Sequence, residues 1–136
     1  MLPQTNSMKV LVTGSNGFIG KNLVLKLGEF DEFSVVLFTR DMAVSLLPSL
    51  VGGADAVVHL AGENRPENID DFVSGNVGVT EAVCAAVRDS GRKIPVIFTS
   101  SSQALLENSY GSSKLKAEVI VEKLYADIST NCVIYR

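Results

Sequence analysis

Short apolar runs rich in β-branched residues alternate with segments of helical periodicity along this chain of 136 residues. Glycine or polar residues bound the apolar runs, a pattern typical of buried parallel strands. We expect strands at residues 9–13, 34–39, 56–60, 95–99 and 131–135. Helices are predicted over 17–27, 69–88 and 110–125, with a weaker helical stretch over 43–50 that Pro48 interrupts. This alternation predicts an α/β fold, a doubly wound parallel sheet with right-handed crossovers and helices on both faces.

Three glycines, Gly14, Gly17 and Gly20, follow the first predicted strand at a spacing of three residues. In such a turn the first glycine permits the tight bend, the second lets a phosphate approach the backbone, and the third allows close helix packing. The N–H groups and the dipole at the helix start then favour a pyrophosphate. A strand-to-helix turn without a ligand is the alternative, but the position between a strand and a helix favours dinucleotide binding.

Tyr110 and Lys114 are four residues apart in a predicted helix and therefore share one of its faces. A phenol has a pKa of about 10, so it is a poor acid or base near neutrality unless a nearby ammonium stabilises its phenolate. Such pairs also arise by chance on exposed helices. A run of serines, residues 100–102, ends the preceding strand, where open α/β sheets bind ligands. The serines could equally be a polar strand end.

Five motifs in this order resemble those of the extended short-chain dehydrogenase/reductase family, over residues 8–136. They are Thr13-Gly-Ser-Asn-Gly-Phe-Ile-Gly20, His59-Leu-Ala-Gly62, Asn76-Val-Gly-Val-Thr80, Thr99-Ser-Ser-Ser102 and Tyr110-Gly-Ser-Ser-Lys114. The resemblance implies a Rossmann-like NAD(P)-binding domain at 8–136 after a tail at 1–7. It implies catalysis by Tyr110, Lys114 and Ser101, with Ser102 as the alternative serine. The cofactor-binding residues that it implies are Gly14, Asn16, Gly17, Phe18, Ile19, Gly20, Leu60, Ala61, Gly62, Tyr110 and Lys114.

The sequence departs from the family pattern in three places. Ala104-Leu-Leu106 stands where the family usually has Val-Tyr-Gly, which weakens the choice between the two serines. The region between the second strand and His59 is short, so the outer third strand of the usual sheet is expected to be missing or replaced by a helix. The acidic residue that would hold an adenosine ribose 2′-hydroxyl is absent, and Arg40 stands nearby. A guanidinium there would pair with a 2′-phosphate, which favours NADP(H) over NAD(H).

Segments at 61–67, 75–76 and 101–104 look like one branch of the family. That branch comprises bacterial reductases of UDP-linked acetamido-dideoxy sugars for capsule and O-antigen, in which a cupin domain follows the reductase domain. The resemblance implies NADP(H)-dependent reduction of a 4-keto UDP-sugar in the cytoplasm. An NAD-dependent 4-epimerase or dehydratase is the alternative enzyme, and a non-catalytic dinucleotide-binding module is the alternative of another class.

The resemblance also implies that the protein forms a homodimer and that this chain is one part of a longer protein. Extended members commonly dimerise through two helices, here 69–88 and 110–125, so a homodimer is expected. The apolar residues Val83, Val87, Leu115 and Val119 would serve either that interface or a core, and the core is the favoured interpretation for each. The second helix has its apolar stripe at Leu115, Val119, Ile120 and Leu124. We expect the chain to be the N-terminal piece of a longer protein, truncated before its substrate-binding half and inactive alone.

Composition excludes several other classes of function. A net charge of −3 offers a nucleic-acid backbone nothing to bind. The cysteines, Cys84 and Cys132, lie far apart, so a metal site of Cys and His is not expected. No apolar run reaches the length of a membrane span, and residues 1–7 lack the features of a signal peptide. His59, the one histidine, is expected to be a core residue on a buried strand rather than a catalyst.

Overall fold

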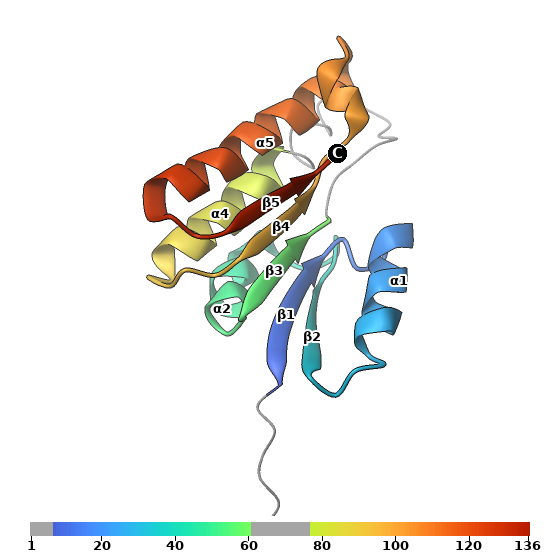
Figure 1. Ribbon diagram of the computed structural model, residues 1–136, viewed down its shortest axis with the longest axis vertical. Coiled ribbons are helices and arrows are strands. Elements are labelled where there is room, and N and C mark those ends of the chain that lie inside the picture. Colours follow the sequence, from blue (N-terminus) through green and yellow to red (C-terminus); the bar gives the residue numbers. More distant parts are fainter. Residues whose placement is uncertain (1–6, 61–76) are drawn as a thin grey trace, which may run out of the picture.

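The computed structural model describes residues 7–60 and 77–136, with only the backbone of residues 102, 103, 109 and 110. Its centre is a five-stranded parallel sheet in the order β2-β1-β3-β4-β5 (Figure 1). The strands are β1 (Met8–Thr13), β2 (Phe33–Phe38), β3 (Ala56–His59), β4 (Val96–Thr99) and β5 (Cys132–Tyr135). The strand order reverses between β1 and β3, which makes that junction the expected ligand-binding edge. The predicted doubly wound α/β sheet is confirmed.

Helices cover the two faces of the sheet unequally. Helix α1 (Phe18–Leu27) lies on one face, and α2 (Leu47–Gly52), α4 (Val79–Asp89) and α5 (Ser109–Ile128) lie on the other (Figure 1). Two short 3₁₀ helices are η1 (Val44–Leu46) and η3 (Ser102–Leu105). Pro48 does not interrupt the second helix as predicted, because it stands in the first turn, where the missing N–H of proline costs no hydrogen bond. The helix expected from residue 69 is described only from 77 onward.

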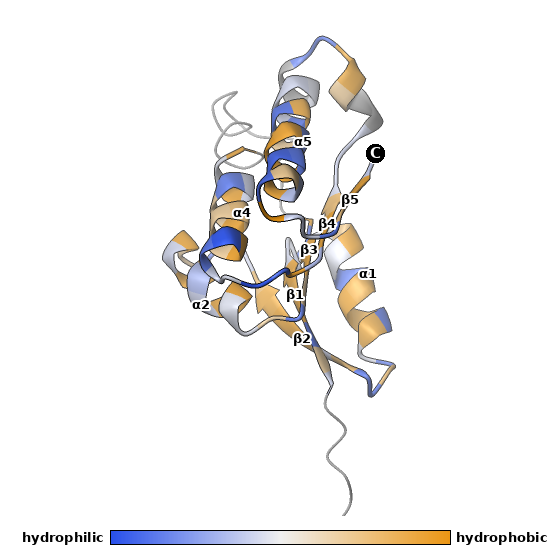
Figure 2. Cartoon of the chain, turned by 60° about the vertical axis from the view of Figure 1, so that its left-hand side comes forward, coloured by the Kyte–Doolittle hydropathy of each residue, from blue (hydrophilic) through white to orange (hydrophobic). Residues whose placement is uncertain are grey.

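The core fills the space between the sheet and α2, α4 and α5. Alternate strand residues point into it, with Leu11, Val57 and Val96 side by side in the register of β1, β3 and β4. Val83 and Val87 on α4 meet these strand residues and are fully buried. Each such side chain contributes about 1.5–3 kcal/mol through its removal from water. In Figure 2 the strands are mostly orange, the colour of hydrophobic residues, whereas orange and blue alternate along α5.

The buried face of α5 differs from its predicted apolar stripe. Leu124 is buried as expected, but Leu115 and Val119 are 42% and 55% exposed. The residues that α5 turns inward are Ser113, Lys114, Ala117, Glu118, Val121 and Leu124. Polar residues therefore occupy core positions near the start of this helix, and two apolar residues are left on its outer side.

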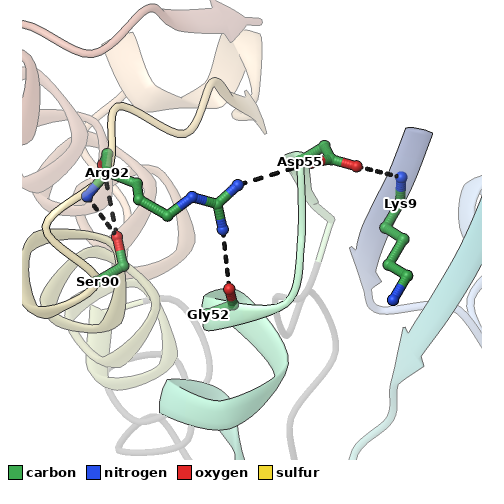
Figure 3. Close-up of polar contacts among 5 residues, drawn as sticks. All are labelled: Lys9, Gly52, Asp55, Ser90 and Arg92. Atoms are coloured by element: carbon green, nitrogen blue, oxygen red, sulfur yellow. Dashed lines mark hydrogen bonds and ion pairs between the residues drawn. The ribbon is translucent and has the colours of Figure 1, made fainter. Parts of the chain in front are cut away.

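Residues 39–55, which the structure describes throughout, form η1 and α2 and contain no strand. Strand β2 is therefore an edge strand, and the expected loss of the outer third strand is confirmed. At the amino ends of the strands Arg92 donates to the carbonyl of Gly52 over 2.8 Å (Figure 3). Its Nη2 also lies 3.6 Å from Oδ1 of Asp55. Asp55 in turn accepts from the backbone N–H of Lys9 over 2.8 Å. These contacts tie the start of β1 to the connections that precede β3 and β4, at the edge opposite the predicted site.

Candidate active site at the carboxyl edge of the sheet

The glycine turn between β1 and α1 has little space for side chains. Gly14 has φ +70°, a conformation that favours glycine, and its carbonyl accepts from the Gly17 N–H over 3.1 Å. A Cβ on Gly20 would collide with that carbonyl and lie 2.7 Å from the Cα of Ser15. A Cβ on Gly17 would lie 3.3 Å from the same oxygen. The tight bend at Gly14 and the close packing at Gly20 thus agree with the sequence analysis, and the approach of a phosphate at Gly17 stays a prediction.

The side chain of Ser15 places a polar atom inside this turn. The side chain of Ser15 is buried, and its Oγ has no hydrogen-bond partner among the described residues. A buried hydroxyl is normally paired, so this orphan fits a site completed by an external group. Helix α1 begins at Phe18, and the first N–H groups of a helix lack partners within it. The turn therefore fits a dinucleotide phosphate, the group predicted for it.

The remaining predicted cofactor residues lie around the turn or outside the described residues. Asn16, Phe18 and Ile19 are exposed on it. Leu60, just beyond β3, is half-buried and donates its N–H to the Thr13 carbonyl over 3.2 Å and to Thr13 Oγ1 over 3.0 Å. Arg40 is exposed, two residues beyond β2. Ala61, Gly62 and Asn76 lie outside the described residues.

His59 belongs to the core, as predicted. It is fully buried, with Nδ1 joined to Thr13 Oγ1 over 2.7 Å and Nε2 joined to Thr80 Oγ1 over 2.8 Å. Its ring stacks on Phe98 at 5.4 Å between centroids. Burial, aided by the positive charge of Lys114, lowers the pKa of His59 to about 3. The neutral imidazole therefore links the end of β1 to α4 and does not act as an acid or base at neutral pH.

This environment predicts acid sensitivity. The unfolded chain binds a proton on His59 below its ordinary pKa of 6.5, and the folded chain does so only near pH 3, so folding is weakened as pH falls between those values. We expect the free energy of unfolding to drop by about 1 kcal/mol per pH unit below about pH 6. Urea unfolding at a series of pH values measures this, and His59→Asn should flatten the slope. An unchanged slope in that variant would contradict the assignment.

Lys114 is the best-defined of the predicted catalytic residues. It is 5% exposed, and its Nζ donates to the Thr99 carbonyl over 2.9 Å and lies 5.0 Å from the centre of the Phe98 ring. Burial lowers the pKa of Lys114 to about 8, and the charge of Glu118 opposes that effect. The ammonium is thereby fixed at the carboxyl end of β4, and it remains mostly charged at neutral pH.

The other predicted catalytic residues flank this position. Tyr110 stands one turn before Lys114, in the first turn of α5, which Asn108 caps by accepting the Gly111 N–H over 2.6 Å. The Tyr110 side chain lies outside the described residues, as does that of Ser102. Ser101 is half-buried two residues beyond β4, and its carbonyl accepts from the Ala104 N–H over 3.0 Å. The glycine turn, Lys114 and Ser101 thus share the carboxyl edge of the sheet.

Two residues near Lys114 were missed by the sequence reasoning. Glu118 is 2% exposed, and Arg136 donates to both of its oxygens, over 2.9 Å from Nε and 2.8 Å from Nη2. The four-residue spacing from Lys114 could have revealed Glu118, but nothing local links residue 136 to it. In the described ranges no group of three metal-ligating side chains occurs, and no helix is long and apolar enough for a membrane span.

Comparison with known proteins agrees with this geometry. A UDP-2-acetamido-2,6-beta-L-arabino-hexul-4-ose reductase from Pseudomonas aeruginosa is 49% identical over 129 residues, which are 95% of this chain and 35% of that relative. The solved capsular polysaccharide assembling protein CapF of Staphylococcus aureus has a TM-score of 0.81 and 34% identity over 95% of this chain and 35% of its own. A UDP-glucuronic acid 4-epimerase from Bacillus cereus, solved with NAD, has a TM-score of 0.82 over 93% of this chain and 55% of its own. At 22% identity that last likeness shows the fold alone.

The chain thus spans 35% of the length of each of the first two proteins. The pattern of the NAD dependent epimerase/dehydratase family matches residues 10–136, nearly all of the chain. The resemblance stated from the five motifs is therefore confirmed. With its glycine turn and its buried lysine at one edge of a parallel sheet, the chain belongs to the NAD dependent epimerase/dehydratase family.

Proposed function

We propose that this chain is the dinucleotide-binding part of an NADP(H)-dependent reductase that converts a 4-keto UDP-(acetamido)dideoxy sugar into its alcohol. The observation that carries the chemistry is the Lys114 ammonium, buried at the end of β4 on the same edge as the glycine turn. The reductase name of the 49% identical relative supports the substrate class. The name of the capsular polysaccharide assembling protein CapF supports a place in capsular polysaccharide synthesis. A role in O-antigen precursor synthesis and a cytoplasmic location are further parts of this proposal.

Some residues of the chain would bind the dinucleotide, and others would transfer a proton to the sugar. A bound dinucleotide supplies the hydride for the keto carbon. Gly14 and Gly20 shape the turn, Gly17 lets the phosphates approach its backbone, and the Ser15 hydroxyl would donate to them. Tyr110 gives a proton to the sugar oxygen, and Lys114 eases this by stabilising the phenolate that remains. Ser101 orients the carbonyl of the sugar through a hydrogen bond.

An epimerase or dehydratase with tightly held NAD would use the same fold, because fold alone does not determine the reaction. The two kinds of enzyme differ in whether the reaction consumes the dinucleotide. A reductase consumes a dinucleotide for every sugar converted, whereas an epimerase returns its dinucleotide unchanged. Measuring the dinucleotide consumed per sugar converted distinguishes the two. It also identifies a non-catalytic module, which would bind dinucleotide without turnover.

Arg40 is proposed to select NADP(H). Its exposed guanidinium follows β2, where a charge-assisted pair with the adenosine 2′-phosphate would form. We expect Arg40→Ala to weaken NADPH binding about 10–100-fold and to leave NADH binding unchanged. Fluorescence titration of the complete protein with both cofactors measures this. Lys93→Ala, which removes the same charge from the opposite edge of the sheet, should change neither affinity; equal loss in both variants, or none in Arg40→Ala, would refute the selection.

The exposed apolar residues of α5 support the proposed homodimer. Leu115 and Val119 stand four residues apart on the outer side of α5, beside α4, and are 42% and 55% exposed. Neither is buried in the core, unlike Val83 and Val87, which supports the interface interpretation for this pair. Pairing of α4 and α5 with their symmetry mates would bury both residues in a four-helix seam.

A charge placed in this seam should separate the protomers. We expect Val119→Glu to convert a dimer into a monomer at micromolar concentration, because the buried carboxylate would lack a partner. Sedimentation velocity of the complete protein measures the change. Leu25→Glu is the matched control, since Leu25 is 72% exposed on α1, on the other face of the sheet, and its replacement should leave the dimer intact. A monomeric parent protein would contradict the proposal.

A further inference from the structure

The buried face of α5 carries two charged residues at four-residue spacing. Lys114 and Glu118 are 5% and 2% exposed, and Tyr110 precedes Lys114 by the same four residues in the sequence. An unpaired charge in such a position costs several kcal/mol. A buried ammonium and a buried carboxylate therefore lie one helical turn apart on the side of α5 that faces the sheet.

Glu118 is held in its charged form. The Arg136 guanidinium donates to both carboxylate oxygens in a fork, over 2.9 and 2.8 Å. These hydrogen bonds lower the pKa of Glu118 in spite of its burial, which acts in the opposite direction. The Arg136 side chain is 44% exposed and that of Glu118 is 2% exposed, so water screens the positive charge of the arginine more strongly than the negative charge of the carboxylate.

Lys114 depends on its surroundings for its charge. Its Nζ contacts the Thr99 carbonyl and the Phe98 ring, and burial lowers the pKa of Lys114 to about 8. Among the described side chains, two titratable groups interact with its charge: Glu118 on α5, and His59 on β3, which is neutral. Arg136, after β5, is paired with Glu118. Among these groups Glu118 is the one with a negative charge at neutral pH.

We propose that Glu118 is a positioning residue for the Tyr110–Lys114 pair. Its carboxylate lies one helical turn beyond Lys114 and is fixed by Arg136, and it keeps the buried lysine charged. This inference rests on the proposed function, since a charged Lys114 matters for the proton that Tyr110 transfers. The role goes beyond packing. A neutral side chain of the same shape would fill the space but would not hold the charge.

Titration of Lys114 in this chain tests the inference without substrate or cofactor. The ε-carbon signal of Lys114 is followed by NMR with isotope-labelled lysine and is assigned by its loss in Lys114→Arg. Glu118→Gln keeps the shape and removes the charge, so the midpoint of the Lys114 titration should fall by about one pH unit. Arg136→Lys disturbs the same ion pair but leaves the charge on Glu118, so the midpoint should stay near that of the parent.

Two results would overturn the proposal: an unchanged midpoint in Glu118→Gln, or an equal fall in Arg136→Lys. If Glu118→Gln does not fold, Glu118→Asp decides, because its charge lies one methylene farther away and the midpoint should fall by a smaller amount; no fall contradicts the proposal. In the complete enzyme the alkaline limb of the kcat profile should move with the midpoint. A midpoint that moves in a protein without reductase activity would reject the proposed function and leave the role of Glu118 standing.

Discussion

Gly20→Ala is expected to abolish detectable dinucleotide binding, a loss of at least about 100-fold. The added methyl group would collide with the carbonyl of Gly14 and lie 2.7 Å from the Cα of Ser15, so the collision is with backbone and no side chain can swing away. The start of α1 must then separate from the end of β1. That movement opens the turn around the Ser15 hydroxyl and misaligns the N–H groups proposed to hold the phosphates.

Calorimetric titration of the parent and the variant with NADPH measures this effect. Gly52→Ala is the matched control, because a Cβ at Gly52 has nothing within 4 Å and the residue lies in α2, away from the glycine turn. The control should bind like the parent. Gly20→Ala that binds NADPH with the parent's affinity would show that the cofactor does not lie against this turn.

Tyr110→Phe is expected to reduce kcat of the complete protein by about 10²–10⁴-fold. The substitution removes the hydroxyl that donates the proton and keeps the ring, so KM for NADPH should change little. Lys114 remains charged in this variant, and the cofactor and sugar still bind. The loss therefore falls on the chemical step.

Steady-state kinetics of the two proteins separates kcat from KM. Tyr125→Phe provides the control on the same helix, since Tyr125 is 57% exposed near the far end of α5. It should retain the activity of the parent. A Tyr110→Phe enzyme with unaffected kcat would mean that another group supplies the proton.

The sheet was predictable because parallel strands that are buried on both faces appear in the sequence as short continuous apolar runs. The strand before Gly14 was predicted to within one residue, and the short region before His59 indicated the missing outer strand. Gly14 and Gly20 were predictable for a steric reason, since the positive φ of Gly14 favours glycine and a Cβ at Gly20 would collide with backbone. Local patterns of this kind are contained within a few neighbouring residues.

The inner face of α5 was less predictable. Hydrophobic periodicity assigns apolar residues to the core, so it placed Leu115 and Val119 inside and gave no reason to bury Glu118. The burial of Glu118 depends on Arg136, which lies 18 residues away along the chain and only folding brings near. The buried position of Lys114 depends in the same way on the Thr99 carbonyl at the end of β4.

The central claim is that the glycine turn and the Tyr110–Lys114 pair serve a reduction, and the direct measurement is NADPH oxidation with a 4-keto UDP-acetamido sugar. The complete protein, its Tyr110→Phe variant and the chain of residues 1–136 are compared. We expect the complete protein to consume NADPH in equimolar amount to the alcohol formed and the variant to lose nearly all turnover. The isolated chain should show none, because it spans 35% of the length of the Pseudomonas aeruginosa reductase and of CapF, and we propose that the remaining part holds the sugar against the cofactor. Substantial turnover by the isolated chain, or product formed by the complete protein without NADPH consumption, would contradict this account.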